Sequence, residues 1–351
     1  MKIALDATYS VGRNLTGVGV YSREILLGLP KGRPDTRFLF CFRPHRLLRS
    51  FEHFLPRGTH RGVLFDSWSP HRPDLFHGLN QRLPKCRFKK TITTFHDLFV
   101  LTGDYSTPEF RRRFAGQARD AAAASDMIIA VSEFTASQVE DLLSVPRERI
   151  RVVHHGVIRP AAAEAELIAP RKENIILSVG AIQKRKNIAR MVRVFERLEG
   201  DWKLVLAGAS DGFGASDILD QIERSKKRSS IHVLGYVTDK QLEDLYGRAS
   251  MFFFPSLDEG FGIPVLEAMA RGVPVITSNR SALPEAAGDA AVIVDPTDED
   301  EMLLAVRTVA GQSGFRKELA RRGFERVAGM TWKKAVEETW NCYTELLGRP
   351  V

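Results

Sequence analysis

Short apolar runs alternate with amphipathic stretches along the whole chain. In the first half, apolar runs lie at residues 2–5, 38–42, 74–76, 91–95 and 127–131, and the 3.6-residue periodicity of helices appears at 108–124 and 133–144. In the second half, apolar runs lie at residues 175–179, 202–207, 231–234, 251–254, 273–277 and 291–294. Strands that alternate with helices are typical of a parallel sheet covered by helices. The pattern predicts an α/β protein.

The same pattern predicts two domains. A chain of 351 residues is longer than one hydrophobic core commonly serves. Residues 160–172 are rich in Ala, Glu and Pro and show no strand pattern, which indicates a linker. We expect two Rossmann-like domains with doubly wound parallel sheets, over residues 1–160 and 173–330. A last helix within residues 331–351 is expected to return to the first domain.

Composition argues against several classes of protein. No run of about 18 apolar residues occurs, and Asp6 interrupts the first apolar segment, so we expect neither a spanning helix nor a secretory leader. The three cysteines, Cys41, Cys86 and Cys342, are far apart and predict neither a disulfide framework nor a zinc site. The expected location is the cytoplasm.

The net charge of +8 is placed unevenly. Residues 1–160 carry 25 Lys and Arg against 15 Asp and Glu, whereas residues 161–351 carry 26 against 28. The excess gathers in three clusters: Arg43, Arg46, Arg49, Arg57 and Arg61; Arg82, Lys85, Arg87, Lys89 and Lys90; and Arg111, Arg112, Arg113 and Arg119. No nucleic-acid module accompanies them, so an anionic membrane surface or a lipid-linked phosphate is a better candidate partner than nucleic acid. A solvated basic surface without a partner is the alternative.

The most informative segment runs from Ser256 to Thr277, SLDEGFGIPVLEAMARGVPVIT. It follows the predicted strand 251–254, turns through glycines and enters a helix in which Pro264 suits the first turn. Ligands bind at the carboxyl ends of strands in open α/β sheets, and N–H groups at a helix start favour phosphate. Glu259 and Glu267 flank this helix start, so we expect both carboxylates to face one crevice and to accept hydrogen bonds from hydroxyls. A helix-dipole role for Glu267 and a solvated turn for Glu259 are the alternatives.

A second segment, residues 176–187, combines a strand, Gly180 and the basic pair Arg185 and Lys186 at the opening of the next helix. Two cationic donors beside a helix start suit a diphosphate. A solvated basic pair is the alternative.

Segment 256–277 closely resembles the signature of family 4 of the retaining glycosyltransferases, also named glycosyl transferases group 1. In that signature two glutamates flank seven residues around a Gly-Phe-Gly turn, and Glu259 and Glu267 stand at those positions. The resemblance implies the GT-B fold, with two Rossmann-like domains facing across a cleft, a nucleotide-diphosphate sugar donor, and neither a metal nor a cofactor. It places Glu267 on the ribose hydroxyls and Glu259 on the transferred sugar. It covers nearly the whole chain, but residues 43–90 match nothing in it.

The resemblance also assigns other residues. Arg185 and Lys186 would neutralise the departing phosphate, although Ala181 stands where many members carry a further Arg. The other implied donor-binding residues are Gly17, Gly19, Val237, Gly260, Phe261, Gly262 and Ile263. In the first domain, His96 would lie near the transferred sugar and Asp97 on the acceptor side, with a structural histidine as the alternative for His96. His154 and His155 are interpreted as hinge residues.

The predicted function is transfer of a hexose with retention onto a hydroxyl of a saccharide or lipid-linked acceptor in surface polysaccharide synthesis. Similarity to bacterial mannosyltransferases favours GDP-mannose as the donor, with UDP-glucose next. A non-catalytic nucleotide-sugar-binding scaffold and a GT-B-like epimerase or phosphorylase are the alternatives. A dinucleotide-dependent dehydrogenase is disfavoured because Ser22 replaces the third glycine of G-x-G-x-x-G.

Overall fold

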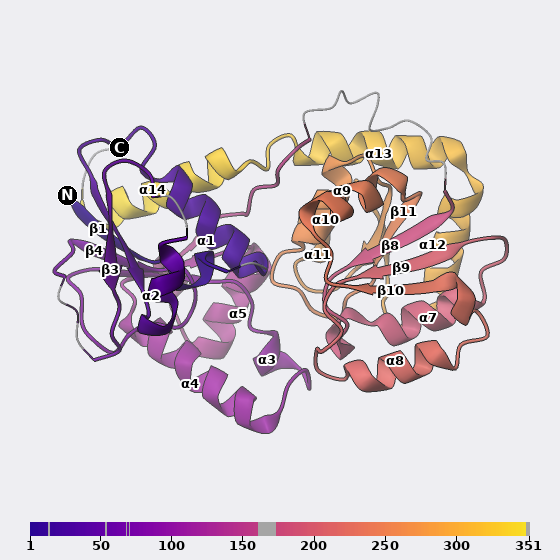
Figure 1. The fold of residues 1–351 in the computed structure, drawn as a ribbon, viewed down its shortest axis with the longest axis horizontal. Helices are drawn as coiled ribbons and strands as arrows, with labels where there is room; N and C mark the ends of the chain where they lie inside the picture. The colour runs from indigo at the N-terminus through magenta and orange to yellow at the C-terminus, as the bar shows by residue number, and fades with distance from the viewer. Residues whose placement is uncertain (13–14, 53–54, 68, 70, 161–172, 349–351) are drawn as a thin grey trace. The chain divides into compact units, whose positions relative to one another are not determined.

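The computed structural model describes residues 1–12, 15–52, 55–67, 69, 71–160 and 173–348. The chain divides into two compact units, one of Met1–Gly156 with Met330–Val351 and one of Val157–Gly329 (Figure 1). The division falls shortly before the predicted domain limit at residue 160. The predicted linker lies, from residue 161 onward, outside the described residues.

The first unit contains a seven-stranded parallel sheet in the order β3-β2-β1-β4-β5-β6-β7. Its strands are β1 (Lys2–Asp6), β2 (Arg37–Phe42), β3 (Thr59–Val63), β4 (Leu75–Gly78), β5 (Thr91–Phe95), β6 (Met127–Ala130) and β7 (Ile150–Val152). Its helices are η1 (Thr8–Ser10), α1 (Gly17–Gly28), α2 (Pro44–Ser50), α3 (Phe99–Thr102), α4 (Pro108–Ala124), α5 (Glu133–Leu143), η2 (Arg147–Arg149) and α14 (Trp332–Leu346). Strand β1 pairs with β2 on one side and with β4 on the other, so the strand order reverses between β1 and β4.

Helices cover both faces of this sheet. Helices α1 and α14 pack side by side on one face, where Ile25 and Val336 join a core with Ile3 and Phe40 (Figure 1). A side chain at Gly28 would come within 2.4 Å of Val336, so glycine allows the close approach of the two helices. Helices α4 and α5 form a second core against the opposite face. The apolar stripes that predicted these helices are the surfaces they bury.

The second unit contains a six-stranded parallel sheet in the order β10-β9-β8-β11-β12-β13. Its strands are β8 (Ile175–Val179), β9 (Lys203–Ala207), β10 (Ile231–Gly235), β11 (Met251–Phe254), β12 (Val275–Ser278) and β13 (Val292–Val294). Its helices are η3 (Lys184–Lys186), α7 (Ile188–Glu196), α8 (Ala215–Glu223), η4 (Arg228–Ser230), α9 (Asp239–Arg248), α10 (Ile263–Ala270), α11 (Leu283–Ala287), α12 (Glu299–Gly311) and α13 (Ser313–Val327). Here the strand order reverses between β8 and β11.

The predicted α/β class, with two Rossmann-like parallel-sheet domains, is confirmed. Two strands were missed, and both lie at a sheet edge. Strand β3 reads Thr-His-Arg-Gly-Val and is mostly half-buried, because an edge strand has only one neighbour and needs little apolar sequence. Strand β7 has three residues and is too short for a pattern.

Hydrogen bonds between buried side chains join helices α1 and α14 to the sheet of the first unit. The Nδ1 atom of His77 lies 2.6 Å from the hydroxyl of Tyr343 in α14, and its Nε2 atom lies 2.8 Å from Oγ1 of Thr94 in β5. The hydroxyl of Tyr21 in α1 lies 2.9 Å from the same Thr94 oxygen. Burial lowers the pKa of His77 to about 3, so its ring is neutral at neutral pH.

We expect Tyr343→Phe to lower the free energy of unfolding of the first unit by about 1–3 kcal/mol, because a buried nitrogen of His77 loses its partner. Denaturant unfolding of the full chain measures this change. Tyr236→Phe, at a half-exposed tyrosine, is the control and should change the free energy by less than about 0.5 kcal/mol. Equal midpoints for Tyr343→Phe and wild type would contradict a role for the hydrogen bond.

Candidate active site

The candidate site of the second unit lies where its strand order reverses. Strand β8 ends at Val179 and its neighbour β11 ends at Phe254, so the loops that follow leave the same edge of the sheet. The backbone N–H of Leu257 donates to the carbonyl of Arg185 at 2.8 Å. The side-chain amide of Asn187 donates to the carbonyl of Pro255 at 3.1 Å. The two loops are therefore fixed to each other at the place where open α/β sheets bind ligands.

Glycines allow the sharp turns of both loops. Gly180 has φ +140°, and a side chain there would come within 3.2 Å of Cε of Lys186. Gly262, directly before α10, has φ +108°, and a side chain there would come within 2.9 Å of Leu283. A residue with a side chain would be strained at either position, which explains why both turns contain glycine.

The carboxylate of Glu259 lies between the two predicted phosphate-binding cations. Its Oε2 is 2.8 Å from Nη1 of Arg185, and its Oε1 is 2.6 Å from Nζ of Lys186. The hydroxyl of Ser256 donates to Oε1 at 2.7 Å. All three charged side chains are only about one-tenth exposed, at 9%, 11% and 11% for Arg185, Lys186 and Glu259. The structure thus brings these three predicted residues together.

The charge of Glu259 is stabilised by its partners. Burial alone raises the pKa of Glu259, but the charges of Arg185 and Lys186 outweigh burial, and hydrogen bonds from Lys186 and Ser256 add to them. The result is a pKa lowered to about 2, so the carboxylate is ionised at neutral pH.

Other contacts fix the position of this charge cluster. The ammonium group of Lys186 lies 4.5 Å from the centroid of the Phe254 ring. Arg185 also donates to the carbonyl of Asp258. The backbone N–H of Glu259 donates to the hydroxyl of Ser281 at 2.9 Å. These contacts hold Arg185, Lys186 and Glu259 in one arrangement in the absence of a ligand.

Glu267 lies in the second turn of α10 and has a different environment. Its carboxylate accepts a hydrogen bond from the hydroxyl of Tyr246 at 3.2 Å. Burial raises the pKa of Glu267, and the charge of Arg271 and the bond from Tyr246 oppose that shift in part. Within the described residues, no hydrogen bond or ion pair joins Glu267 to Glu259, so a common crevice for both carboxylates stays a prediction.

The remaining donor-side residues of the second unit lie in two loops. Residues 260–262 connect Glu259 to Ile263, the first residue of α10, and the Phe261 side chain is buried. Val237 lies between β10 and α9, beside the half-exposed Tyr236. Their roles in donor binding stay predictions.

In the first unit, His96 directly follows β5 and is 7% exposed. Its Nε2 lies 2.9 Å from the carbonyl oxygen of Leu79, so Nε2 carries the proton. Burial lowers the pKa of His96 to about 4 against the effect of this hydrogen bond, so the ring is neutral at neutral pH. The ring stacks on His155 with centroids 5.5 Å apart. The partly buried Asp97 follows it.

The glycine loop of the first unit has a steric explanation. Gly19, in the first turn of α1, is buried, and a side chain there would come within 2.9 Å of the carbonyl oxygen of Tyr9. Gly17 is the exposed first residue of the helix. Close packing of η1 on α1 thus requires one glycine, while donor binding by Gly17 and Gly19 stays a prediction.

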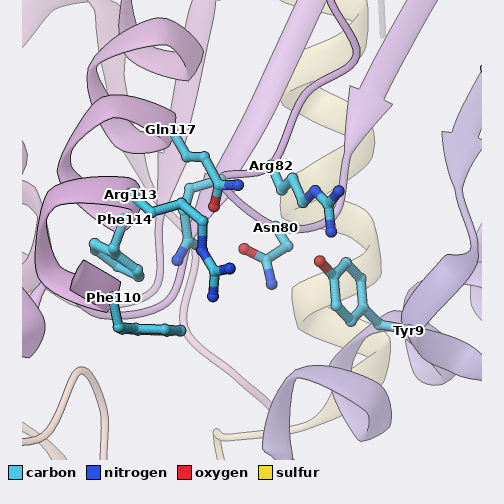
Figure 2. A pocket seen from close by; sticks show the side chains of 8 residues that line it. Tyr9, Asn80, Arg82, Phe110, Arg113, Phe114 and Gln117 are labelled. Carbon is cyan, nitrogen blue, oxygen red and sulfur yellow. The ribbon is translucent and has the colours of Figure 1, made fainter. Parts of the chain in front are cut away.

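Two hollows of the first unit were not predicted from the sequence. One, of about 340 Å³, is lined by Tyr9, Asn80, Gln81, Arg82, Phe110, Arg113, Phe114 and Gln117 (Figure 2). The other, of about 750 Å³, shares Tyr9 and Arg82 and adds Arg43, Arg46 and Arg49. Of the residues that line the two hollows, the sequence pattern marks only the arginines, as members of basic clusters. The uncharged lining residues come from three separate segments and carry no common pattern.

Within the described residues, no three His, Cys, Asp or Glu side chains gather in a way that could hold a metal ion. None of the helices in that part of the chain combines the length and apolar character needed to span a bilayer.

Known proteins match both units. The family described as "Glycosyl transferases group 1" matches residues 162–326, and "Glycosyltransferase Family 4" matches residues 16–158. O-antigen chain mannosyltransferase B of Escherichia coli is 30% identical over 282 residues, which cover 77% of this chain and 74% of that protein.

Solved structures share the fold. Sucrose-phosphate synthase of Thermosynechococcus elongatus superposes with a TM-score of 0.79 at 19% identity over 99% of both chains. HepE of Anabaena, solved in complex with UDP and glucose, superposes with a TM-score of 0.72 at 15% identity over 98% of both chains. With the matches to both family descriptions and the relative at 30% identity, the chain belongs to family 4 of the glycosyltransferases, the glycosyl transferases group 1.

Proposed function

We propose that this glycosyltransferase moves mannose from GDP-mannose, with retention, onto a hydroxyl of a saccharide or lipid-linked acceptor in surface polysaccharide synthesis. The observation that carries the proposal is the placement of Arg185, Lys186 and Glu259 at the strand reversal between β8 and β11. The mannosyltransferase relative supports mannose. UDP-glucose is the second candidate donor, and HepE, which has the same fold, was solved with UDP and glucose. A cytoplasmic location and contact with an anionic membrane surface stay predictions.

In this proposal the cations of the site stabilise the leaving group. When the bond between the sugar C1 and the phosphate oxygen breaks, negative charge develops on the nucleoside diphosphate. Arg185 and Lys186, fixed and nearly buried, are suited to neutralise it. The N–H groups at the start of α10, directly after Gly262, add a second favourable region for phosphate.

The acceptor enters on the face that the diphosphate leaves. Its hydroxyl oxygen forms the new bond to C1 of a short-lived oxocarbenium-like sugar, and its proton passes to an oxygen of the departing phosphate. Configuration is retained without a side-chain nucleophile. Glu259 would orient the sugar through its hydroxyls. His96, which is neutral, would do so only by hydrogen bonding and shape.

Donor binding must also rearrange the charge cluster. In the structure Glu259 forms ion pairs with Arg185 and Lys186, the two cations that a diphosphate would bind. The donor phosphate therefore competes with this carboxylate for Arg185 and Lys186. An incoming donor would release Glu259 toward the sugar while the phosphate takes its place.

Removing the charge of Glu259 tests this competition. Glu259→Gln should bind GDP or UDP about tenfold more tightly than wild type, because an uncharged amide competes less for Arg185 and Lys186. The same variant should lose at least about tenfold in transfer rate, because the contact to the sugar is weakened. Calorimetry measures the affinity and a transfer assay measures the rate. Glu223→Gln, which changes an exposed carboxylate paired with Arg228, is the control. Unchanged nucleotide affinity in Glu259→Gln would refute the competition.

Nucleotide-binding screens would identify the base of the donor. Thermal-shift and calorimetric screens with GDP, UDP, ADP and their sugars should show stabilisation of the wild-type chain by one nucleotide. If Glu267 binds the ribose, the Glu267→Ala variant should lose this stabilisation by the nucleotide. Glu267→Gln keeps an oxygen that can accept the hydrogen bond from Tyr246, so it separates loss of the ribose contact from loss of the bond to Tyr246. If no nucleotide stabilises the wild-type chain, the proposal that the donor is a nucleotide sugar is wrong. Binding without hydrolysis or transfer would favour the non-catalytic scaffold.

The proposed mechanism needs no metal ion. Transfer should continue within about twofold in EDTA, because Arg185 and Lys186 supply the positive charge at the leaving group. Arg185→Ala should reduce the rate by about 100-fold or more, as removal of one electrostatic donor commonly does. A rate abolished by EDTA and restored by Mg²⁺ or Mn²⁺ would overturn the metal-free mechanism.

A further inference from the structure

We propose that the larger hollow of the first unit binds a phosphate or diphosphate group of a phosphorylated saccharide, and that the adjoining hollow of Figure 2 takes the sugar. The identity of this ligand as the acceptor rests on the proposed transfer reaction. The binding of phosphate does not, since it depends only on residues of the first unit.

The larger hollow, of about 750 Å³, lies at the strand reversal of the first sheet. Its lining comes from the segments that follow three neighbouring strands. Thr8 and Tyr9 follow β1, Arg43 follows β2, and Arg82 lies in the loop after β4. This is the edge at which open α/β sheets bind ligands, and it is the counterpart in the first unit of the Glu259 position in the second.

The charge of the lining is strongly positive. Arg43, Arg46, Arg49 and Arg82 line the hollow together with His45, and Glu52 is the only carboxylate among the described residues that line it. Arg43 is paired with Asp66. Among the described residues no ion pair is formed by Arg46, Arg49 or Arg82. Three cations around one space repel one another, and a bound anion would remove that repulsion.

Arg43 lines the hollow and is held in place by several contacts. Its side chain is only 5% exposed, and besides pairing with Asp66 it donates to the carbonyl of Arg82 at 3.4 Å. Its backbone N–H donates to the hydroxyl of Thr8 at 3.1 Å. Its buried Nε has no partner among the described residues. Guanidinium groups bind phosphate through two parallel hydrogen bonds, so arginines are the residue type expected for this ligand.

The start of α1 supplies a second, independent feature. Thr16, the N-cap residue of this 12-residue helix, lines the hollow, and its side chain makes no capping hydrogen bond. The following residue is Gly17, which puts no side chain over the first turn. N–H groups of a first helical turn and the helix dipole both favour an anion. The arginines and the helix start thus favour the same kind of ligand.

The adjoining hollow has the composition of a saccharide site. Figure 2 shows Arg113 and Gln117 on α4 and Asn80, Arg82 and Tyr9 around one space, with the rings of Phe110 and Phe114 at its side. Amide and phenol groups can both donate to and accept from sugar hydroxyls. Tyr9 and Arg82 border both hollows, so one ligand can place its phosphate in the first and its sugar in the second.

A membrane surface is the competing ligand for these arginines. Helix α2 exposes Leu48 at 80%, and Phe51 after it is exposed at 65%, which are features that a bilayer would contact. A flat anionic surface, however, would not need a recessed hollow with a buried arginine. The phosphorylated saccharide accounts for both the depth and the charge of the site.

The experiment measures binding to the full chain by calorimetry with GDP present to occupy the donor site. The probes are α-mannose 1-phosphate, inorganic pyrophosphate, the neutral methyl α-mannoside, and phosphatidylcholine vesicles with and without phosphatidylglycerol. The test variant is Arg46→Ala with Arg49→Ala. The control is Arg37→Ala with Arg147→Ala, which removes the same charge at exposed positions of the same unit. GDP affinity is measured for every variant.

We expect wild type to bind the two phosphorylated probes at least about tenfold more tightly than methyl α-mannoside. The test variant should lose about tenfold for both phosphorylated probes, while the control keeps wild-type affinity and GDP binding is unchanged. Equal losses in test and control variants, equal affinities for charged and neutral sugars, or arginine-dependent binding to anionic vesicles alone would each overturn the inference. Phosphate binding that depends on Arg46 and Arg49 in a chain that binds no GDP would support the pocket and refute the proposed donor.

Discussion

Reversal of strand order in a parallel sheet is the constraint on which both candidate sites depend. All strands of such a sheet run in one direction, so the loops after their carboxyl ends share one edge. Where the order reverses, connections on the two sides leave in opposite directions and an opening remains between them. The reversal lies between β1 and β4 in one sheet and between β8 and β11 in the other. The Arg43 hollow and the Glu259 cluster follow these strands.

The two sites differ in how their positive charge is balanced. In the second unit, Arg185 and Lys186 are nearly buried, and a buried cation without a partner is costly, so a carboxylate of the chain itself pairs with them. In the first unit, Arg49 and Arg82 are exposed and water stabilises their charge. A donor bound as proposed would therefore displace Glu259 from the cations, whereas a phosphate bound as proposed to Arg46, Arg49 and Arg82 would break no ion pair of the described residues. Only the first of these proposed binding events would couple ligand binding to the position of Glu259.

Periodicity alone predicted the α/β class and the central strands, because a strand buried on both faces must be apolar throughout. The edge strand β3 was missed because burial on one side requires little apolar sequence. At the site, the sequence predicted that Arg185, Lys186 and Glu259 serve one ligand, but not that they bind one another. That contact depends on the pairing of β8 with β11, which joins segments about 70 residues apart. The hollows were missed for the same reason, since Tyr9, Asn80 and Gln117 meet only after the sheet forms.

His96 illustrates how burial limits what a predicted residue can do. Its ring lies against Tyr21 and His155, and its Nε2 proton is held by the carbonyl of Leu79. Protonation would place a positive charge beside His155, whose pKa burial also lowers, and His96 contributes to that shift. The ring of His96 therefore stays neutral through the range in which an exposed histidine titrates. Such a residue offers a ligand its shape and a fixed tautomer, but no positive charge. In the proposed transfer, the positive charge at the leaving group would therefore come from Arg185 and Lys186 and not from His96.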